Sequence, residues 1–213
     1  MTNMHWEAQP RVPAGNPDGG QWTSDGISRA EAAAREAAGI NESRAEEYPV
    51  YEREPVLASE ISGKVPVDRE GKPVPVKTKK QYHVTKWENV QPILEEGFDL
   101  KYVRPRWRND YAVSLSKGLK PALDFFTGSG QYFNLDKYAL LEVTVKGRFA
   151  NEYDVRRDIN FAGSSAQEYT RNFISSGYDA YDMSGGLYVY NPRAITRIRV
   201  VPEEDVKKRG RKP

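Results

Sequence analysis

The sequence predicts an α+β domain, with terminal segments on either side that add little to its core. Runs of β-branched and aromatic residues recur from Gln81–Thr85 to Ile195–Val201, and the strongest of them, Tyr138–Val145, is expected to be a buried strand. Apolar residues at helical spacing lie between these runs, as in Ser165–Ser176. Because both patterns alternate along one stretch of chain, we expect strands and helices to share a single core.

Composition limits the size of the folded part and the classes of site. Only 38% of the 213 residues are hydrophobic, which is low for a chain that is globular throughout. The 32 basic and 30 acidic residues nearly cancel, so the net charge of +2 does not by itself indicate a nucleic-acid partner. The lack of cysteine excludes disulfides and thiolate ligands. The two histidines, His5 and His83, are far apart, so no metal is expected.

Four regions are expected along the chain. Residues 1–26 are rich in Pro, Gly, Asn and Asp and are predicted to be disordered. Residues 27–60 read as a helical or linker segment, because a capping-box pattern precedes an alanine-rich run. Residues 61–202 are the main domain. Residues 203–213 are a basic tail whose RGRKP run resembles an AT-hook core, although a solubilising tail is the commoner interpretation.

No membrane contact is expected. No apolar run approaches the ~18 residues of a spanning helix, and the first residues contain no hydrophobic signal core. We therefore expect neither a membrane segment nor export.

The main domain begins with an irregular element and then a strand that carries a histidine. A turn signal at Asp68–Lys72 between short valine-rich pieces predicts a hairpin or an irregular edge element. The strand Gln81–Thr85 follows, and after it a short helix that ends at Gly97. His83 is thus placed on a strand just before a helix. For an arbitrary histidine, a position in the core or on a strand face is the commonest role.

A basic, aromatic loop and a second strand and helix come next. The loop KYVRPRWRND suits a phosphate or a stacked base, and a solvated loop explains it equally well. Its candidate nucleic-acid- or phosphate-binding residues are Arg104, Arg106 and Arg108. Tyr111–Ser116 alternates as a strand with Ser114 and Ser116 on one face, and Gly118–Phe126 is expected to be helical.

The last third of the chain predicts three more strands. Gly177–Gly186 is expected to form a strand and a turn, and Gly186–Pro192 another strand. Ile195–Val201 then closes the fold.

Taken in order, these segments resemble the ADP-ribosyltransferase fold. The residues that carry the resemblance are YHVT on the first strand, ILEEGF in the following helix, YAVSLSKGLKPALDFF, GYDAY, and the final YVYNPRAITRIRVV. They are similar to the histidine-type transferases and above all to phage-encoded relatives carried on polyvalent proteins. The resemblance covers roughly Val65 to Val201. It implies a split, mainly antiparallel sheet with a central cleft, and His83 on the wall of that cleft.

The resemblance also implies that NAD is bound as a substrate. In such enzymes the strand histidine binds the nicotinamide ribose, and the next residue offers backbone groups to the carboxamide. The second strand and its helix supply further contacts to the ring and carboxamide. The pocket must orient the ring and leave the ribose C1 open, because the departing nicotinamide leaves oxocarbenium character there. Carried over by position, the expected NAD-binding residues are His83, Val84, Thr85, Tyr111, Ser114, Ser116 and Phe125.

The chain departs from the family at one catalytic position. The family places a glutamate at the start of the last conserved strand, where Gly186 stands in this sequence. A carboxylate from elsewhere could replace it, and the candidate catalytic residues are Asp182 and Glu142, with Asp179 as a further possibility. A site that binds nucleotide without turnover also remains open. So does a basic RNA-phosphate pocket, as in the related RNA 2′-phosphotransferases.

A second resemblance concerns the N-terminal segment. Pro10–Ser24, PRVPAGNPDGGQWTS, resembles a short Gly-rich element of tailed-bacteriophage portal and head-morphogenesis proteins. One aromatic anchor, Trp22, suits a partner's groove or sheet edge, and a flexible tail without a partner explains the segment equally well. The expected partners are therefore phage head or portal proteins, and the expected location is the bacterial cytoplasm or the virion.

Three functions follow from these observations. The first is a phage- or prophage-encoded ADP-ribosyltransferase-like protein that transfers ADP-ribose from NAD to a host protein or nucleic acid. The second is a catalytically degenerate structural protein of the virion or head. The third is an RNA- or DNA-directed enzyme or binder of the same fold.

Overall fold

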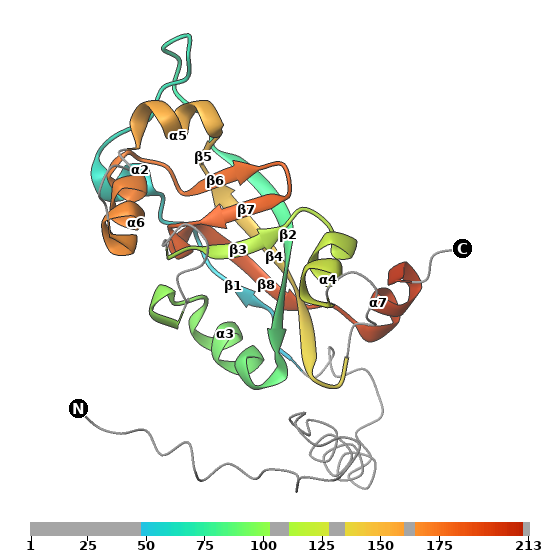
Figure 1. Cartoon of the computed structure of the whole chain (residues 1–213). Coiled ribbons are helices and arrows are strands. Elements are labelled where there is room, and N and C mark those ends of the chain that lie inside the picture. Colours follow the sequence, from blue (N-terminus) through green and yellow to red (C-terminus); the bar gives the residue numbers. More distant parts are fainter. Residues whose placement is uncertain (1–47, 103–110, 128–134, 160–164, 211–213) are drawn as a thin grey trace, which may run out of the picture. The chain divides into compact units, whose positions relative to one another are not determined.

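The most strand-like run of the sequence lies in the middle of the sheet. In the computed structural model, which describes residues 48–102, 111–127, 135–159 and 165–210, the strand β4 (Tyr138–Gly147) pairs with β2 (Lys77–Lys86) on one side and with β8 (Ile195–Val200) on the other (Figure 1). Leucine, valine and alanine dominate its buried positions, as expected for a strand covered on both faces.

The eight strands of the described residues form one open sheet in the order β1-β8-β4-β2-β3-β7-β6-β5. All neighbours are antiparallel except β5 and β6. The prediction of a mixed domain with a mainly antiparallel sheet is therefore confirmed. The remaining strands are β1 (Tyr51–Glu52), β3 (Val113–Ser116), β5 (Phe149–Ala150), β6 (Ala180–Met183) and β7 (Gly186–Val189).

Six described α-helices connect and cover these strands. They are α2 (Ala58–Ser62), α3 (Val90–Glu96), α4 (Leu119–Thr127), α5 (Glu152–Asp158), α6 (Ala166–Ser175) and α7 (Glu203–Gly210). Short 3-10 turns lie at η3 (Trp87–Asn89), η4 (Leu100–Tyr102) and η5 (Pro192–Ala194). The fold thus reaches beyond the expected limits of the main domain, since β1 precedes residue 61 and α7 follows residue 202.

Residues of β2 alternate between the two faces of the sheet. We call the face that carries Gln81, His83 and Thr85 the His83 face, and the opposite face, with Tyr82 and Val84, the Tyr82 face. Directly opposed residues of antiparallel strands share a face, so the register of each pair extends this assignment across the sheet.

Helices pack on both faces. On the His83 face, Val90 of α3 belongs to the same buried cluster as Leu141 of β4. On the Tyr82 face, Leu119 of α4 and Val206 of α7 pack with Val84 in another cluster. The sheet is therefore the middle layer of the domain, and its face decides which environment a strand residue meets.

A buried carboxylate ties three distant segments together. Asp179 is 0% exposed and accepts hydrogen bonds from the backbone N–H of Ala58 (2.7 Å) and of Arg148 (2.8 Å) and from Asn191 Nδ2 (2.7 Å). Burial raises the pKa of Asp179 despite these donors. The same residue binds through its backbone, because its N–H donates to the Arg148 carbonyl and its carbonyl accepts from Asn191 N–H. Asp179 thereby fixes the start of β6.

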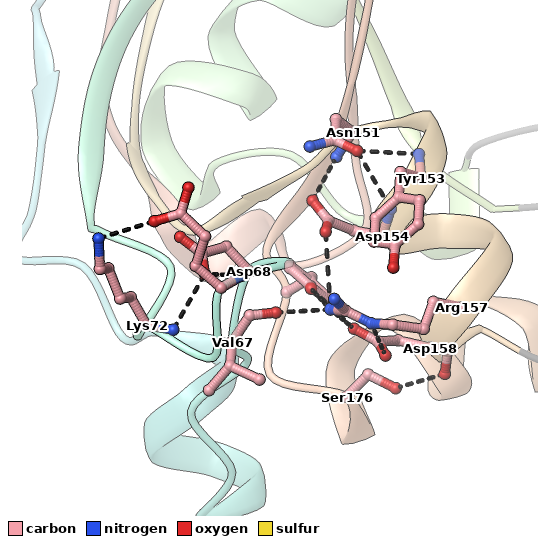
Figure 2. Close-up of polar contacts among 11 residues, drawn as sticks. Val67, Asp68, Lys72, Asn151, Tyr153, Asp154, Arg157, Asp158 and Ser176 are labelled. Atoms are coloured by element: carbon pink, nitrogen blue, oxygen red, sulfur yellow. Dashed lines mark hydrogen bonds and ion pairs between the residues drawn. The ribbon is translucent and has the colours of Figure 1, made fainter.

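The predicted hairpin around Asp68 is present and rests on α5. Asp68 Oδ1 accepts from the backbone N–H of Glu70 and of Lys72, each at 2.9 Å, which closes the turn. Figure 2 shows Arg157 of α5 directed at the Val67 carbonyl and at Asp158. The bond to the Val67 carbonyl attaches the hairpin to the helix, and the bond to Asp158, within α5, holds the guanidinium in place.

The packing around Asp179 gives a test of the fold. A Cβ at Gly147 would lie 2.7 Å from the Asp179 side chain, whereas a Cβ at Gly185 would have no atom within 4 Å. Gly147→Ala should therefore lower the free energy of unfolding by about 1–3 kcal/mol, the usual cost of overpacking. Chemical denaturation would measure this, with Gly185→Ala as the matched control that leaves stability unchanged. Equal stability of the two variants would contradict the close contact.

Candidate functional site

The three strands that carry the motif residues are neighbours. The strands β2, β3 and β7 are consecutive in the sheet. Ser116 of β3 stands opposite Tyr82 of β2 on one side and opposite Gly186 of β7 on the other. Residues that are far apart in the sequence are thus brought within two strand spacings, about 10 Å.

The pairing of β2 with β3 is very short. Tyr82–Ser116 is the one pair between these strands in the described residues, whereas β2 pairs with β4 along its whole length. A ladder that continued would next place Val84 opposite Ser114. Instead, His83 Nδ1 lies 3.0 Å from the Ser114 carbonyl oxygen. Because a carbonyl only accepts, the ring nitrogen donates this bond. We call His83, Val84, Thr85 and the Ser114 carbonyl the divergence site.

The ring of His83 is fixed from a second direction. It is half-buried and meets the ring of Phe98 edge to face, with 5.0 Å between centroids. Thr85, on the same face, is buried, and its Oγ1 accepts a hydrogen bond from Asn89 Nδ2 (3.3 Å). These contacts form because η3 and α3 directly follow β2 in the sequence, and the chain turns back over this end of the strand. The divergence site is therefore held by backbone, aromatic and helix-start contacts.

Two of the other expected NAD-binding side chains lie on the opposite face of the sheet. Ser114 and Ser116 are on the Tyr82 face, because Ser116 is paired with Tyr82, so only the Ser114 backbone meets the His83 ring. Tyr111 precedes β3 and is joined through its backbone to Thr170 of α6. The side chain of Phe125, in α4, lies outside the described residues, as do the candidate phosphate-binding residues Arg104, Arg106 and Arg108.

Glu142 faces away from His83 and is held in an ion pair. It stands opposite Tyr82, on the Tyr82 face. Its carboxylate accepts from Arg199 at 2.8 and 3.2 Å and lies 3.2 Å from Lys80 Nζ. Burial alone raises the pKa of Glu142, but the hydrogen bonds and charges of Arg199 and Lys80 outweigh it and hold this pKa below its usual value. The arrangement stabilises an ionised carboxylate between β4 and β8.

Asp182 shares a face with His83. It stands opposite Leu187, and Leu187 stands opposite Leu115, which continues the His83 face through β3, β7 and β6. Its Oδ2 lies 2.5 Å from Lys79 Nζ and its Oδ1 3.8 Å from Lys117 Nζ. Oδ1 is nevertheless buried without a hydrogen-bond partner. Of the two carboxylates predicted as catalytic, Asp182 is thus the one that this face can use.

The structure adds residues that the sequence-based prediction missed. Lys79 and Gln81 precede His83 on the same face of β2, and Gln81 Oε1 is also buried without a hydrogen-bond partner. Period-two alternation along the strand would have placed both residues beside His83. Lys117 could not have been placed in this way, because its position depends on how β3 ends against the β6–β7 turn, where its N–H donates to the Gly185 carbonyl.

The sequence matches no model of a protein family and no curated protein. Within the described residues, no group of three or more His, Asp or Glu side chains is placed to hold a metal ion. None of the described helices has the length and apolar character needed to cross a membrane.

The Glu142 ion pair predicts a pH dependence of stability. The folded pKa of Glu142 lies below its unfolded value of about 4.3. Its contribution is therefore complete above that pH and is lost as pH falls through the folded pKa. Glu142→Gln should reduce the free energy of unfolding at pH 7 by about 1–3 kcal/mol, and the difference from the wild type should shrink towards pH 2–3. Urea denaturation across pH would test this, and a constant difference would contradict it.

Proposed function

We propose that the chain is an ADP-ribosyltransferase that binds NAD at the divergence site. The observation that supports this most directly is the position of His83. The histidine that resembles the family's ribose-binding residue stands where the ladder between two neighbouring strands stops, with its ring fixed by the Ser114 carbonyl. The split in the sheet that the resemblance implies corresponds, in this proposal, to the divergence of β2 and β3.

A strand whose pairing with a neighbouring strand is interrupted is suited to bind an amide there. Beyond Tyr82, no residue of β3 in the described part of the chain is paired with β2, and backbone N–H and C=O groups on that side can bind a ligand. The carboxamide of nicotinamide carries a donor and an acceptor, as a peptide does, and can extend the interrupted ladder. In the proposal the backbone of Val84 binds the carboxamide and His83 binds the nicotinamide ribose. Phe98 limits the movement of the histidine ring.

The proposed reaction breaks one bond and forms one. The bond between the ribose C1 and the nicotinamide nitrogen breaks, and its electron pair leaves with neutral nicotinamide. A nucleophilic oxygen or nitrogen of the acceptor bonds to C1 and releases its proton. Positive charge develops on the ribose, so a fixed carboxylate on the same side lowers the barrier.

Asp182 is the carboxylate that we assign to this role. A glutamate does not fit in place of Gly186, because a Cβ at this position would lie 1.9 Å from the Leu115 carbonyl oxygen. Asp182 lies on the hairpin strand next to β7 and on the His83 face. Its Oδ2 is held by Lys79, and its buried Oδ1 fits a donor such as a ribose hydroxyl.

A second candidate function is a nucleotide-binding structural protein without turnover. The close packing at Gly186 favours it, because this position excludes the carboxylate that the family uses. A phage origin and a virion or host partner rest on the resemblance of Pro10–Ser24, which lies outside the described residues.

NAD turnover is the test of the proposed function. Wild-type protein and His83→Ala would be incubated with labelled NAD, alone and with bacterial lysate or nucleic acid, and nicotinamide release and label transfer followed. We expect transfer by the wild type and a loss of at least tenfold in the variant, since one well-placed ligand contact of ~1.4 kcal/mol corresponds to that factor. The melting temperature of His83→Ala should change by only a few degrees.

The control for this experiment is Tyr82→Phe, the neighbouring residue on the opposite face, which should keep wild-type turnover. Tight NAD binding without nicotinamide release would favour the structural candidate. If the wild type neither binds nor consumes NAD under any of these conditions, the proposed enzyme function is wrong.

A further inference from the structure

Gln81 is a polar residue in a position that suits an apolar one. It lies in the middle of β2 and is 4% exposed, and the residue opposite it on β4, Val143, is fully buried. Its amide oxygen is buried, and none of the described residues hydrogen-bonds to it. A buried acceptor that stays unpaired lowers stability, and most buried polar groups in folded proteins are paired.

The surroundings of Gln81 place it inside the proposed site. Lys79, Gln81 and His83 follow each other on one face of β2, at intervals of about 7 Å. Lys79 binds Asp182, whose Oδ1 is also buried without a hydrogen-bond partner. Gln81 thus lies between the histidine ring on one side and the Lys79–Asp182 pair on the other. Two buried oxygens on one face, neither with a hydrogen-bond partner among the described residues, indicate a ligand that brings hydrogen-bond donors.

We propose that Gln81 is a substrate-binding residue, and that its amide oxygen accepts a hydrogen bond from a ribose hydroxyl on the nicotinamide side of NAD. The assignment rests on the proposed NAD site and deepens it. His83 binds the nicotinamide ribose in that site, and Gln81 is its neighbour towards Asp182. A hydroxyl of this ribose is therefore the nearest donor that the ligand can offer. Binding satisfies an oxygen that the free protein leaves unpaired.

One substitution at Gln81 should weaken NAD binding without lowering the melting temperature. Gln81→Met keeps the length of the side chain and removes both polar atoms. We expect the melting temperature to stay the same or rise, because an unpaired buried acceptor is lost. We expect the dissociation constant for NAD to increase roughly three- to tenfold, the usual value of one neutral hydrogen bond. Calorimetry with NAD, and thermal unfolding without it, would measure the two effects.

Free nicotinamide is the matched ligand, because it lacks the ribose. Its affinity, followed by NMR, should be the same for the wild type and Gln81→Met. Ser176→Ala is the matched protein control, since Ser176 is a buried polar residue whose Oγ donates to the Asp158 carbonyl at 3.2 Å. That variant should melt a few degrees lower and bind NAD normally.

Three results would overturn the assignment. A lower melting temperature of Gln81→Met with unchanged NAD affinity would make Gln81 a structural residue, while wild-type NAD binding would leave the proposed function standing. Equal weakening for NAD and nicotinamide would exclude the ribose as the donor. No NAD binding by the wild type would remove both proposals together. Should the methionine variant fail to fold, Gln81→Leu is tested with the same readouts.

Discussion

The one-sided pairing of β2 determines where a ligand can bind. On one side β2 is paired with β4 over ten successive residues, and on the other it meets β3 at a single pair. The long ladder holds β2 along its whole length, whereas in the described part of the chain no residue of β3 is paired with the second half of β2. The His83 ring, bonded to the Ser114 carbonyl, holds the two strands at the start of this gap. A peptide-like ligand can complete the ladder there.

The position of Asp182 depends on the buried hydrogen-bond network of Asp179. Asp179 joins α2, the β4–β5 junction and Asn191 through its carboxylate, and it directly precedes β6. Asp182 lies three residues further along, where Lys79 of β2 reaches it. The carboxylate on the His83 face is thus positioned from both ends, by a buried network behind β6 and by an ion pair to the central strand.

Much of the fold follows from local pattern. Alternation predicted the strands around His83, Ser116 and Leu141, and helical spacing predicted α4 and α6 within one residue of their observed limits. The helix expected to end at Gly97 is present as α3, but it begins only at Val90, after the 3-10 turn η3. Turn chemistry at Asp68 predicted the hairpin. The short helix α5 was missed, because its stretch is polar and its apolar contacts come from the distant tyrosines of β6 and α6.

The residues that share a face at the site could not be predicted from local pattern. Strand register decides this, and it depends on pairing between residues that are far apart in the sequence. Ser114 and Ser116 share a face, as predicted, but the pairing of Ser116 with Tyr82 turns that face away from His83. A slip of one residue would have reversed it. The partner of Glu142, Arg199, lies 57 positions away in the sequence. The lack of space at Gly186 depends on a backbone approach by Leu115.

The most direct test of the central claim, that His83 is at the nucleotide site, is the NMR spectrum of the histidine rings with and without NAD. The chain has two histidines, so His83→Ala identifies the signals of each. At neutral pH the His83 ring should carry its proton on Nδ1, as its bond to the Ser114 carbonyl requires. We predict that NAD shifts the His83 signals and leaves those of His5 unchanged. If saturating NAD leaves both rings unchanged, the nucleotide is not bound at the divergence site.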